Sequence, residues 1–351
     1  MSKKIRVMNM LCSNRYSGAE NVVCQIMDLL GDADIDFLYV SPDGPIKEAL
    51  MERNITFVPI NGVSVKEFKR VIEEEKPDII HAHDMRASFF AAIVCGKIPL
   101  ISHIHNNNFD SQKLTVKAIL YRYAARKAKH IFWVSQSSFE GYYFHKGLEY
   151  KSTVLYNVIE PTKLKEKARQ SELKTKYDIV YVGRLTYQKN PQRLVKVLEE
   201  IKNSKPDLRS AIIGTGELED EVHKMVNEKN LGNNIDLLGF QTNPYGILQK
   251  AELMIMTSRW EGTPMCALEA MSLGVPIVST PVDGLKDLVK DGETGFLKDT
   301  NDNLKESCLE ILNNSSLREK MSKKSKKRAS ELMNIENYRR VILEQYEDKV
   351  Q

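Results

Sequence analysis

The stretch DIVYVGRLTYQKNP, residues 178–191, contains one complete transition from a strand to a helix. It begins with a short, mostly apolar run that ends in Gly183, as a buried strand does. A mostly polar loop follows, and Pro191 suits the first position of a helix because its fixed φ is already helical. The stretch therefore predicts one strand-loop-helix unit of a parallel β-sheet covered by helices.

Strand and helix patterns alternate in this way through both halves of the chain. In the first half we expect strands at 5–10, 37–40, 56–60, 79–82, 100–104 and 131–134, and helices after Gly18 and at 46–53, 65–75, 87–94 and 114–129. In the second half we expect strands at 178–183, 210–213, 235–238, 253–256 and 276–279. Between the two series, residues 159–176 are dominated by Lys and Glu and lack a strand pattern. The sequence thus predicts two open α/β domains that bind ligands at the carboxyl ends of their strands.

The composition is that of an ordinary folded protein. The chain has 351 residues, of which 42% are hydrophobic and 28% charged, so two domains are expected and long disordered segments are not. A net charge of +4 does not indicate a nucleic-acid partner. The five scattered cysteines favour buried thiols in a reducing compartment. The longest apolar run, residues 89–95, is too short to cross a bilayer and the N-terminus lacks a signal-peptide core, so the expected location is the cytoplasm.

A second informative stretch is RWEGTPMCALEAM, residues 259–271. If a helix begins near Met265 after the Gly-Thr-Pro turn, Glu261 lies on the entry loop and Glu269 one turn inside the helix. Carboxylates accept hydrogen bonds from sugar hydroxyls, and the unpaired N–H groups at a helix start attract phosphate. This combination suits a sugar nucleotide. On the alternative interpretation, Glu261 is a helix-entry charge and Glu269 a solvated helix residue.

Arg184 and Lys189 lie on the loop of the first stretch, directly after its strand. The planar guanidinium and the mobile ammonium can bracket a pyrophosphate from two sides. A loop of solvated basic residues is the simpler alternative.

These stretches stand in a fixed order with several others: 182–185 (VGRL), 189–190 (KN), 213–217 (IGTGE), 238–240 (LGF), 261–269, 274–276 (GVP) and 291–297 (DGETGFL). In this order the chain resembles the large retaining glycosyltransferase family with the GT-B fold, called family 4 or glycosyl transferases group 1. The resemblance spans most of the chain and is densest from residue 178 to residue 297.

The resemblance implies two Rossmann-like, doubly wound α/β domains facing each other across a cleft. Residues 1–158 would bind the acceptor, with a last helix at about 335–351 packing back onto them, and residues 159–334 would bind the nucleotide sugar. The implied reaction moves a sugar from a nucleoside diphosphate, most commonly UDP, to a saccharide or polyprenyl-linked acceptor of a surface polysaccharide such as capsule or exopolysaccharide. It would take place in the cytoplasm or at the cytoplasmic face of the membrane, without a metal or other cofactor.

The resemblance also assigns roles to residues. Arg184 and Lys189 would neutralise the donor diphosphate, Glu269 would bind the ribose and Glu261 would hold the donor sugar. The implied catalytic residues are Glu261, His105, Arg184 and Lys189. The implied donor-binding residues are Gly18, Arg184, Lys189, Gly214, Gly239, Phe240, Glu261, Gly262, Thr263, Pro264, Met265 and Glu269.

Two features of the first half match the family. Gly18 corresponds to a glycine-containing loop near the cleft, where the missing Cβ lets the backbone approach a ligand. Ser17 stands where a second glycine is common, and a helix start capped by Ser17 explains this segment equally well. His105, in SHIHN at 102–106, matches the family histidine that touches the donor sugar or the acceptor.

Two patterns raise the alternative of a metal site. His81 and His83 have a spacing that suits metal ligation, but no clear third ligand accompanies them. Hydrogen bonding within the fold accounts for His81 and His103 equally well. Asp34-Ile35-Asp36 has the spacing of a DxD metal motif. It precedes a strand instead of following one, which favours an acidic surface turn.

The helix expected at 114–129 is basic and amphipathic. Basic residues at 113, 117, 122, 126, 127 and 129 are interleaved with Leu114, Val116, Ile119, Leu120 and Tyr123. Such a helix can rest on anionic lipid and hold a nearby cleft beside a lipid-linked acceptor. In the simpler account the apolar residues face the core and the bases extend to solvent.

Two other functions stay open. A nucleotide-sugar epimerase or hydrolase on the same fold would convert the donor without an acceptor. A non-catalytic partner subunit would bind the donor and transfer nothing. The presence of Arg184, Lys189, Glu261 and Glu269 together disfavours the non-catalytic subunit.

Overall fold

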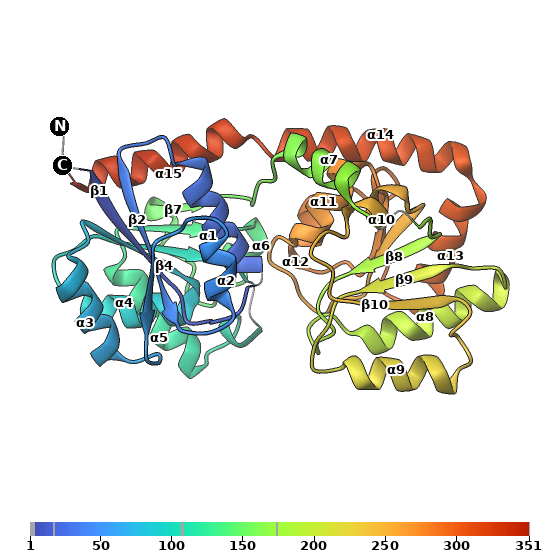
Figure 1. The fold of residues 1–351 in the computed structure, drawn as a ribbon, viewed down its shortest axis with the longest axis horizontal. Helices are drawn as coiled ribbons and strands as arrows, with labels where there is room; N and C mark the ends of the chain where they lie inside the picture. The colour runs from blue at the N-terminus through green and yellow to red at the C-terminus, as the bar shows by residue number, and fades with distance from the viewer. Residues whose placement is uncertain (1–3, 17, 107–108, 173–174, 351) are drawn as a thin grey trace. The chain divides into compact units, whose positions relative to one another are not determined.

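The computed structural model describes residues 4–16, 18–106, 109–172 and 175–350, and the chain forms two compact units. Unit 1 consists of Met1–Asn157 and Ile335–Gln351, and unit 2 of Val158–Asn334. Each unit contains one parallel β-sheet with helices around it (Figure 1). The predicted pair of parallel α/β sheets is confirmed.

Unit 1 has a seven-stranded sheet of order β3-β2-β1-β4-β5-β6-β7. Its strands are β1 (Ile5–Met10), β2 (Ile35–Pro42), β3 (Phe57–Ile60), β4 (Ile79–His83), β5 (Leu100–Ile104), β6 (His130–Trp133) and β7 (Ser152–Val154). Its helices are α1 (Gly18–Leu29), α2 (Ile46–Met51), α3 (Val65–Glu75), α4 (Asp84–Val94), α5 (Val116–Lys127), α6 (Gln136–Glu140) and α15 (Ile335–Val350). The order reverses between β1 and β4, which creates a crevice at the carboxyl ends of these two strands.

Unit 2 repeats this plan with a six-stranded sheet of order β10-β9-β8-β11-β12-β13. Its strands are β8 (Ile179–Val182), β9 (Ser210–Ile213), β10 (Ile235–Gly239), β11 (Leu253–Met256), β12 (Ile277–Ser279) and β13 (Gly295–Leu297). Its helices are α7 (Pro161–Gln170), α8 (Pro191–Ser204), α9 (Glu219–Glu228), α10 (Tyr245–Lys250), α11 (Met265–Leu273), α12 (Asp283–Leu288), α13 (Asn301–Asn313) and α14 (Ser315–Leu332). Here the order reverses between β8 and β11, so the equivalent crevice lies after these strands.

The two faces of the unit 1 sheet are covered by different helices. Successive residues of a strand point to opposite faces. On one face, Oγ of Ser102 lies 2.8 Å from Oγ of Ser88 in α4 and 2.9 Å from the hydroxyl oxygen of Tyr121 in α5. On the other, Nδ1 of His81 lies 2.7 Å from the hydroxyl oxygen of Tyr346 in α15. The last helix of the chain is therefore part of the first unit's packing.

Two strands were absent from the prediction, namely β7 and β13. Each is three residues long and lies at an edge of its sheet. Such a strand is too short to show a periodic pattern, and its pairing with a neighbour defines it.

The Asp34-Ile35-Asp36 pattern lies at the amino end of β2, away from the strand ends that bind ligands in such sheets. Oδ2 of Asp36 is 2.7 Å from Nε of Arg6 on the neighbouring strand. This ion pair at the start of the sheet accounts for Asp36 without a metal.

Candidate functional site

The motifs of the second half meet at the switch point of the unit 2 sheet, where β8 and β11 pair in parallel. The loop after β8, residues 183–190, carries Arg184 and Lys189. The loop after β11, residues 257–264, carries Glu261 and leads into α11. Parallel strands present their carboxyl ends at the same edge, so the fold brings these two loops together.

Hydrogen bonds from side chains hold the two loops against each other. Nε2 of Gln188 donates to the carbonyl of Trp260 at 2.9 Å, and Nη2 of Arg259 donates to Oδ1 of Asn190 at 3.0 Å. The hydroxyl of Thr257 donates to the carbonyl of Asn190 at 3.1 Å. Asn190 has a φ of 53°, a left-handed conformation that asparagine adopts more readily than most residues. Its turn directs the chain into α8 and fixes the loop that carries Lys189.

A buried ion pair lies at the centre of this arrangement. Nζ of Lys189 is 2.6 Å from Oε1 of Glu261, and the hydroxyl of Ser258 donates to the same oxygen at 2.5 Å. Burial alone would lower the pKa of Lys189, but the charge and hydrogen bond of Glu261 outweigh it, and this pKa is raised. Lys189 therefore stays cationic at neutral pH. In the described part of the chain, Oε2 of Glu261 has no hydrogen-bond partner.

Two residues outside the predicted site support the Glu261 loop from behind. The N–H of Glu261 donates to Oδ2 of Asp283 at 3.4 Å, and the N–H of Gly284 donates to the Glu261 carbonyl at 3.4 Å. A Cβ on Gly284 would lie 1.4 Å from the carbonyl oxygen of Gly262. Only glycine lets α12 approach the loop this closely. Nothing local in the sequence indicates this contact, because it joins two segments that the fold alone brings together.

Glu269 lies in α11, which begins at Met265 as predicted. Its Oε1 accepts a hydrogen bond from the hydroxyl of Tyr245 at 2.9 Å, while Oε2 has no hydrogen-bond partner within the described residues. Burial raises the pKa of Glu269, and the Tyr245 hydrogen bond and the charge of Lys167 oppose this rise. The thiol of Cys266 interacts electrostatically with Lys189, Glu261 and Glu269, which places all three charges in one neighbourhood.

The start of α11 leaves backbone donors available. Pro264 occupies the N-cap position and provides no side-chain cap. The N–H groups of Met265 and Cys266 have no acceptor in the part of the chain that the structure describes. Gly262, Thr263 and Pro264 are buried beneath them. Unpaired N–H groups at a helix start favour an anionic or oxygen-rich ligand.

Arg184 is exposed, and its guanidinium has neither a hydrogen-bond nor an ion-pair partner among the described residues. Its charge acts on the neighbouring Lys189. The turn at Gly214 packs against its loop, since a Cβ there would lie 2.0 Å from the carbonyl oxygen of Gly183. Gly239 ends β10 with a φ of 62°, and the side chain of the following Phe240 is exposed. All the predicted site residues of the second half thus lie in unit 2, at the carboxyl ends of β8, β9, β10 and β11.

Unit 1 has a pocket of about 270 Å³ at its own switch point. The lining residues are Leu11, Cys12, Ser13, Glu20, His83, Asp84, Met85, Arg86, Ala87, Ile104, Asn106 and Lys117. Gly18 begins α1 two residues before Glu20. A Cβ on Gly18 would meet no described atom within 4 Å, so packing within the chain does not require glycine there. Ser17, the expected cap, lies outside the described residues.

His105 stands between two of these lining residues, Ile104 and Asn106, and is buried. Its N–H donates to Oδ1 of Asp84 at 3.1 Å, and its Nε2 is 2.9 Å from Nδ1 of His83. Asp84 has a φ of 71°, an uncommon conformation that this hydrogen bond helps to hold. Burial lowers the pKa of His105 to about 4, and the charge of Glu20 opposes the shift. The imidazole is therefore neutral at pH 7.

His105 belongs to a cluster of four buried imidazoles. The ring centroids of His103 and His105 are 4.2 Å apart, and those of His81 and His83 are 4.3 Å apart. His81, His83 and His103 each place one nitrogen within 4.8 Å of the others, which identifies them as a candidate metal cluster. The rings of His81 and His103 are parallel to within 8°, so their in-plane lone pairs do not converge on one ion. We interpret the cluster as neutral stacked imidazoles.

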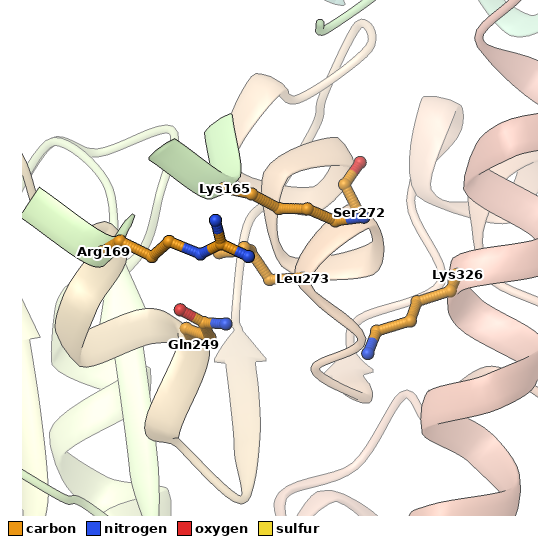
Figure 2. Close-up of a pocket in the computed structure, with 6 residues that line it drawn as sticks. All are labelled: Lys165, Arg169, Gln249, Ser272, Leu273 and Lys326. Atoms are coloured by element: carbon orange, nitrogen blue, oxygen red, sulfur yellow. The ribbon is translucent and has the colours of Figure 1, made fainter. Parts of the chain in front are cut away.

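A second cavity, of about 250 Å³, lies beside the last turn of α11 in unit 2. Figure 2 shows Lys165 and Arg169 of α7 on one side of this turn and Lys326 of α14 on the other. The last turn of a helix leaves carbonyl groups unpaired, and nearby cations stabilise them. The unpaired carbonyl groups at that helix end account for these basic residues. The cavity lies away from the carboxyl ends of the strands.

Comparison with known sequences matches each unit to a glycosyltransferase family description. The family described as glycosyl transferases group 1 matches residues 163–328, and the one described as glycosyltransferase family 4 matches residues 16–163. An uncharacterised glycosyltransferase of Methanocaldococcus jannaschii is 32% identical over 60% of this chain and 57% of its own length. The chain thus aligns with little more than half of that relative. An Escherichia coli enzyme, UDP-Gal:alpha-D-GlcNAc-diphosphoundecaprenol alpha-1,3-galactosyltransferase, is 26% identical over 85% of each chain.

Solved structures share the fold across the whole chain. HepE of Anabaena, determined in complex with UDP and glucose, has a TM-score of 0.84 and 19% identity, covering 98% of this chain and all of its own. TarM of Staphylococcus aureus, determined with UDP among its ligands, has a TM-score of 0.80 and 15% identity, covering 99% of this chain and 100% of its own. With two parallel sheets, motifs at both switch points and family matches from residue 16 to residue 328, the chain belongs to the GT-B glycosyltransferases of family 4.

Proposed function

We propose that this protein transfers a hexose, with retention of configuration, from a UDP-sugar to a lipid-linked saccharide during synthesis of a surface polysaccharide. Unit 2 binds the donor and unit 1 the acceptor. UDP is favoured because HepE and TarM were both determined with UDP. The Escherichia coli relative and one from Campylobacter jejuni are named for diphospho-undecaprenol acceptors, which favours an acceptor of that class.

One observation carries the proposal. Glu261 and Glu269 each use Oε1 for a hydrogen bond inside the protein, while Oε2 of each lacks a hydrogen-bond partner among the described residues. A carboxylate held in this way has its orientation fixed and keeps acceptor sites for ligand hydroxyls. We assign the donor hexose to Glu261 and the ribose to Glu269. The free N–H groups of Met265 and Cys266 add donors for ligand oxygens near these carboxylates.

The positive charge in this arrangement suits a leaving diphosphate. Lys189 remains cationic beside Glu261, and the guanidinium of Arg184 has no ion-pair partner within the described residues. Both side chains would stabilise the negative charge that develops on the nucleoside diphosphate. The proposal includes no metal, because these two cations supply the neutralising charge.

The chemical step follows from this placement. The bond between the sugar anomeric carbon and the diphosphate oxygen breaks through an oxocarbenium-like state. An acceptor hydroxyl forms the new bond on the same face, and its proton passes to the departing phosphate oxygen. The products are the glycosylated acceptor and UDP. No covalent sugar-enzyme intermediate forms, so trapping a glycosylated carboxylate on the denatured protein would contradict this step.

The location of the reaction follows from its acceptor. A saccharide carried on a polyprenyl diphosphate is anchored in a bilayer, and the donor is a water-soluble nucleotide. We therefore place the protein at the cytoplasmic face of the membrane. No helix within the described residues is long and apolar enough to cross a bilayer.

A transfer assay combined with calorimetric titration tests the proposal. Glu261→Gln should lower the turnover number about 100-fold and leave the Kd for UDP within about threefold, because its partner is the sugar. Arg184→Ala should weaken UDP binding about tenfold or more, because it removes a charge-assisted contact. Glu310→Gln, on an exposed position of α13, is the matched control. Equal losses of UDP binding and of turnover in Glu261→Gln would refute the assignment of Glu261 to the sugar. Consumption of the donor without an acceptor would identify the protein as a hydrolase or epimerase.

A further inference from the structure

The outward face of α5 in unit 1 is apolar. Val116, Ile119, Leu120 and Tyr123 follow the spacing i, i+3, i+4, i+7, which aligns side chains along one face of a helix. Val116 is 73% exposed and Ile119 51% exposed. Leu114, just before the helix, is 63% exposed. The expectation of a core-facing position is wrong for these residues.

A different set of residues attaches α5 to the core of unit 1. Ala118, Tyr121, Ala124 and Ala125 are buried against the sheet and α4. The helix therefore has two apolar faces, and only the inner one is used by the fold. On the adjacent helix α4, the ring of Phe89 lies 6.4 Å from that of Tyr123, and Ile93, one turn further along, is 42% exposed.

The charged side chains of the α5 segment itself have one sign. Residues 113–129 contain six basic side chains and no acidic one. Arg126 and Lys127 are exposed in the last turn of the helix, and Lys129 is exposed just after it. The guanidinium of Arg122 stacks on the Phe144 ring with its Cζ atom 4.4 Å from the centroid, which keeps this charge at the surface.

We infer that this surface, made of the outward side chains of α5 together with Leu114 and Ile93, is a docking surface for an anionic lipid bilayer. The apolar stripe would enter the boundary between headgroups and acyl chains, and the flanking cations would contact lipid phosphates. A protein partner fits less well, because the cores of protein interfaces are depleted in charged residues and lysine is uncommon in them.

This inference deepens the proposed function. The lipid-binding surface is argued from α5 and its neighbours, and only its role in presenting the acceptor rests on the proposed function. Lys117 belongs to α5 and also lines the unit 1 pocket. A bilayer contacting α5 would therefore lie beside that pocket. An acceptor carried by a lipid diphosphate could then reach the pocket without leaving the membrane.

Flotation of the full chain with vesicles, without substrates, tests the surface. We expect binding to vesicles of phosphatidylcholine with 30% phosphatidylglycerol, little binding to pure phosphatidylcholine, and loss of binding as salt rises. Ile119→Ser/Tyr123→Ser should weaken binding at least fivefold. The control Met51→Ser/Tyr150→Ser removes two exposed apolar side chains elsewhere in unit 1 and should leave binding unchanged. Circular dichroism at matched temperature checks that each variant is folded.

A second pair of variants separates charge from apolar contact. Arg126→Glu/Lys127→Glu should abolish the preference for anionic vesicles, whereas Lys323→Glu/Lys327→Glu on α14 should preserve it. Failure of the wild type to bind, equal binding by the α5 variants, or self-association through α5 in place of vesicle binding would each overturn the inference. Transfer to a water-soluble acceptor analogue is measured in parallel. If vesicle binding holds and transfer fails, the proposed reaction is wrong and the docking surface stands.

Discussion

Lys189 and Glu261 form an ion pair in unit 2, with Nζ 2.6 Å from Oε1, although they lie 72 residues apart in the chain. Their side chains are only 13% and 4% exposed. The pair joins the loop after β8 to the loop after β11. In the proposed function it also joins the residue that stabilises the diphosphate to the one that holds the sugar.

Removing one partner of this pair should destabilise unit 2. Lys189→Met or Glu261→Gln leaves a buried group without its partner, which costs about 3 kcal/mol or more. The double variant should lose less stability than the sum of the losses in the two single variants. Differential scanning calorimetry measures these losses, with the exposed pair Lys327 and Glu331 as control. Strictly additive losses would show that the two groups do not interact in solution.

Tyr245→Phe should weaken UDP binding about fivefold, since one hydrogen bond to a carboxylate contributes about 1 kcal/mol or more. The hydroxyl of Tyr245 fixes Oε1 of Glu269 at 2.9 Å, and its loss frees the carboxylate to rotate. Titration calorimetry with UDP measures the change. Tyr150→Phe, an exposed position of unit 1, should have no effect. An unchanged Kd for UDP in Tyr245→Phe would contradict the assignment of Glu269 to the ribose of the nucleotide.

Gly284→Ala should impair both stability and transfer. The added methyl group would lie 1.4 Å from the carbonyl oxygen of Gly262, so the Glu261 loop must move. We expect a loss of about 3 kcal/mol, by analogy with overpacked cores, and a large fall in turnover. Gly232→Ala is the control, because a Cβ there meets nothing within 4 Å. Wild-type turnover in Gly284→Ala would mean that the loop position is unimportant for catalysis.

Unit 1 should lose stability in mild acid. Burial lowers the pKa of His81 to about 3 and that of His105 to about 4. The unfolded chain therefore binds more protons than the folded one below about pH 6.5, and stability falls as the pH falls toward 4. For His105 alone the full loss is about 3 kcal/mol.

Thermal unfolding between pH 7.5 and pH 5 measures this effect. The slope of Tm against pH should decrease in His103→Gln, which removes one buried imidazole from the cluster. His223→Gln, exposed on α9, should leave the slope unchanged. A Tm independent of pH in this range would contradict the neutral cluster.

Local pattern was sufficient for most of the fold. The predicted bounds of β1, β5, β9, β11 and α3 coincide with the observed ones, because each is a short apolar or amphipathic segment with clear ends. The outward face of α5 could not be predicted. That helix has two sets of apolar residues, and the sequence does not show which set is buried. The set with mostly small side chains, rich in alanine, lies against the sheet because it permits closer packing.

The candidate site could be predicted only in part. The sequence singles out Arg184, Lys189, Glu261 and Glu269 because each lies in a motif that follows a strand, and the structure places all four in unit 2. Ser258, Tyr245 and Gly284 were not found, since their contacts depend on which loops become neighbours. The histidine cluster likewise depends on the register of β4 and β5, which pairs His83 with His103.

The most direct test of the central claim is a crystal structure of the protein with an intact UDP-sugar. We predict one ligand at the carboxyl ends of β8 and β11, with its ribose hydroxyls on Glu269, its hexose hydroxyls on Glu261, and its diphosphate in contact with Arg184 and Lys189. A nucleotide sugar bound elsewhere, or bound at this edge with neither carboxylate contacting a hydroxyl, would contradict the account.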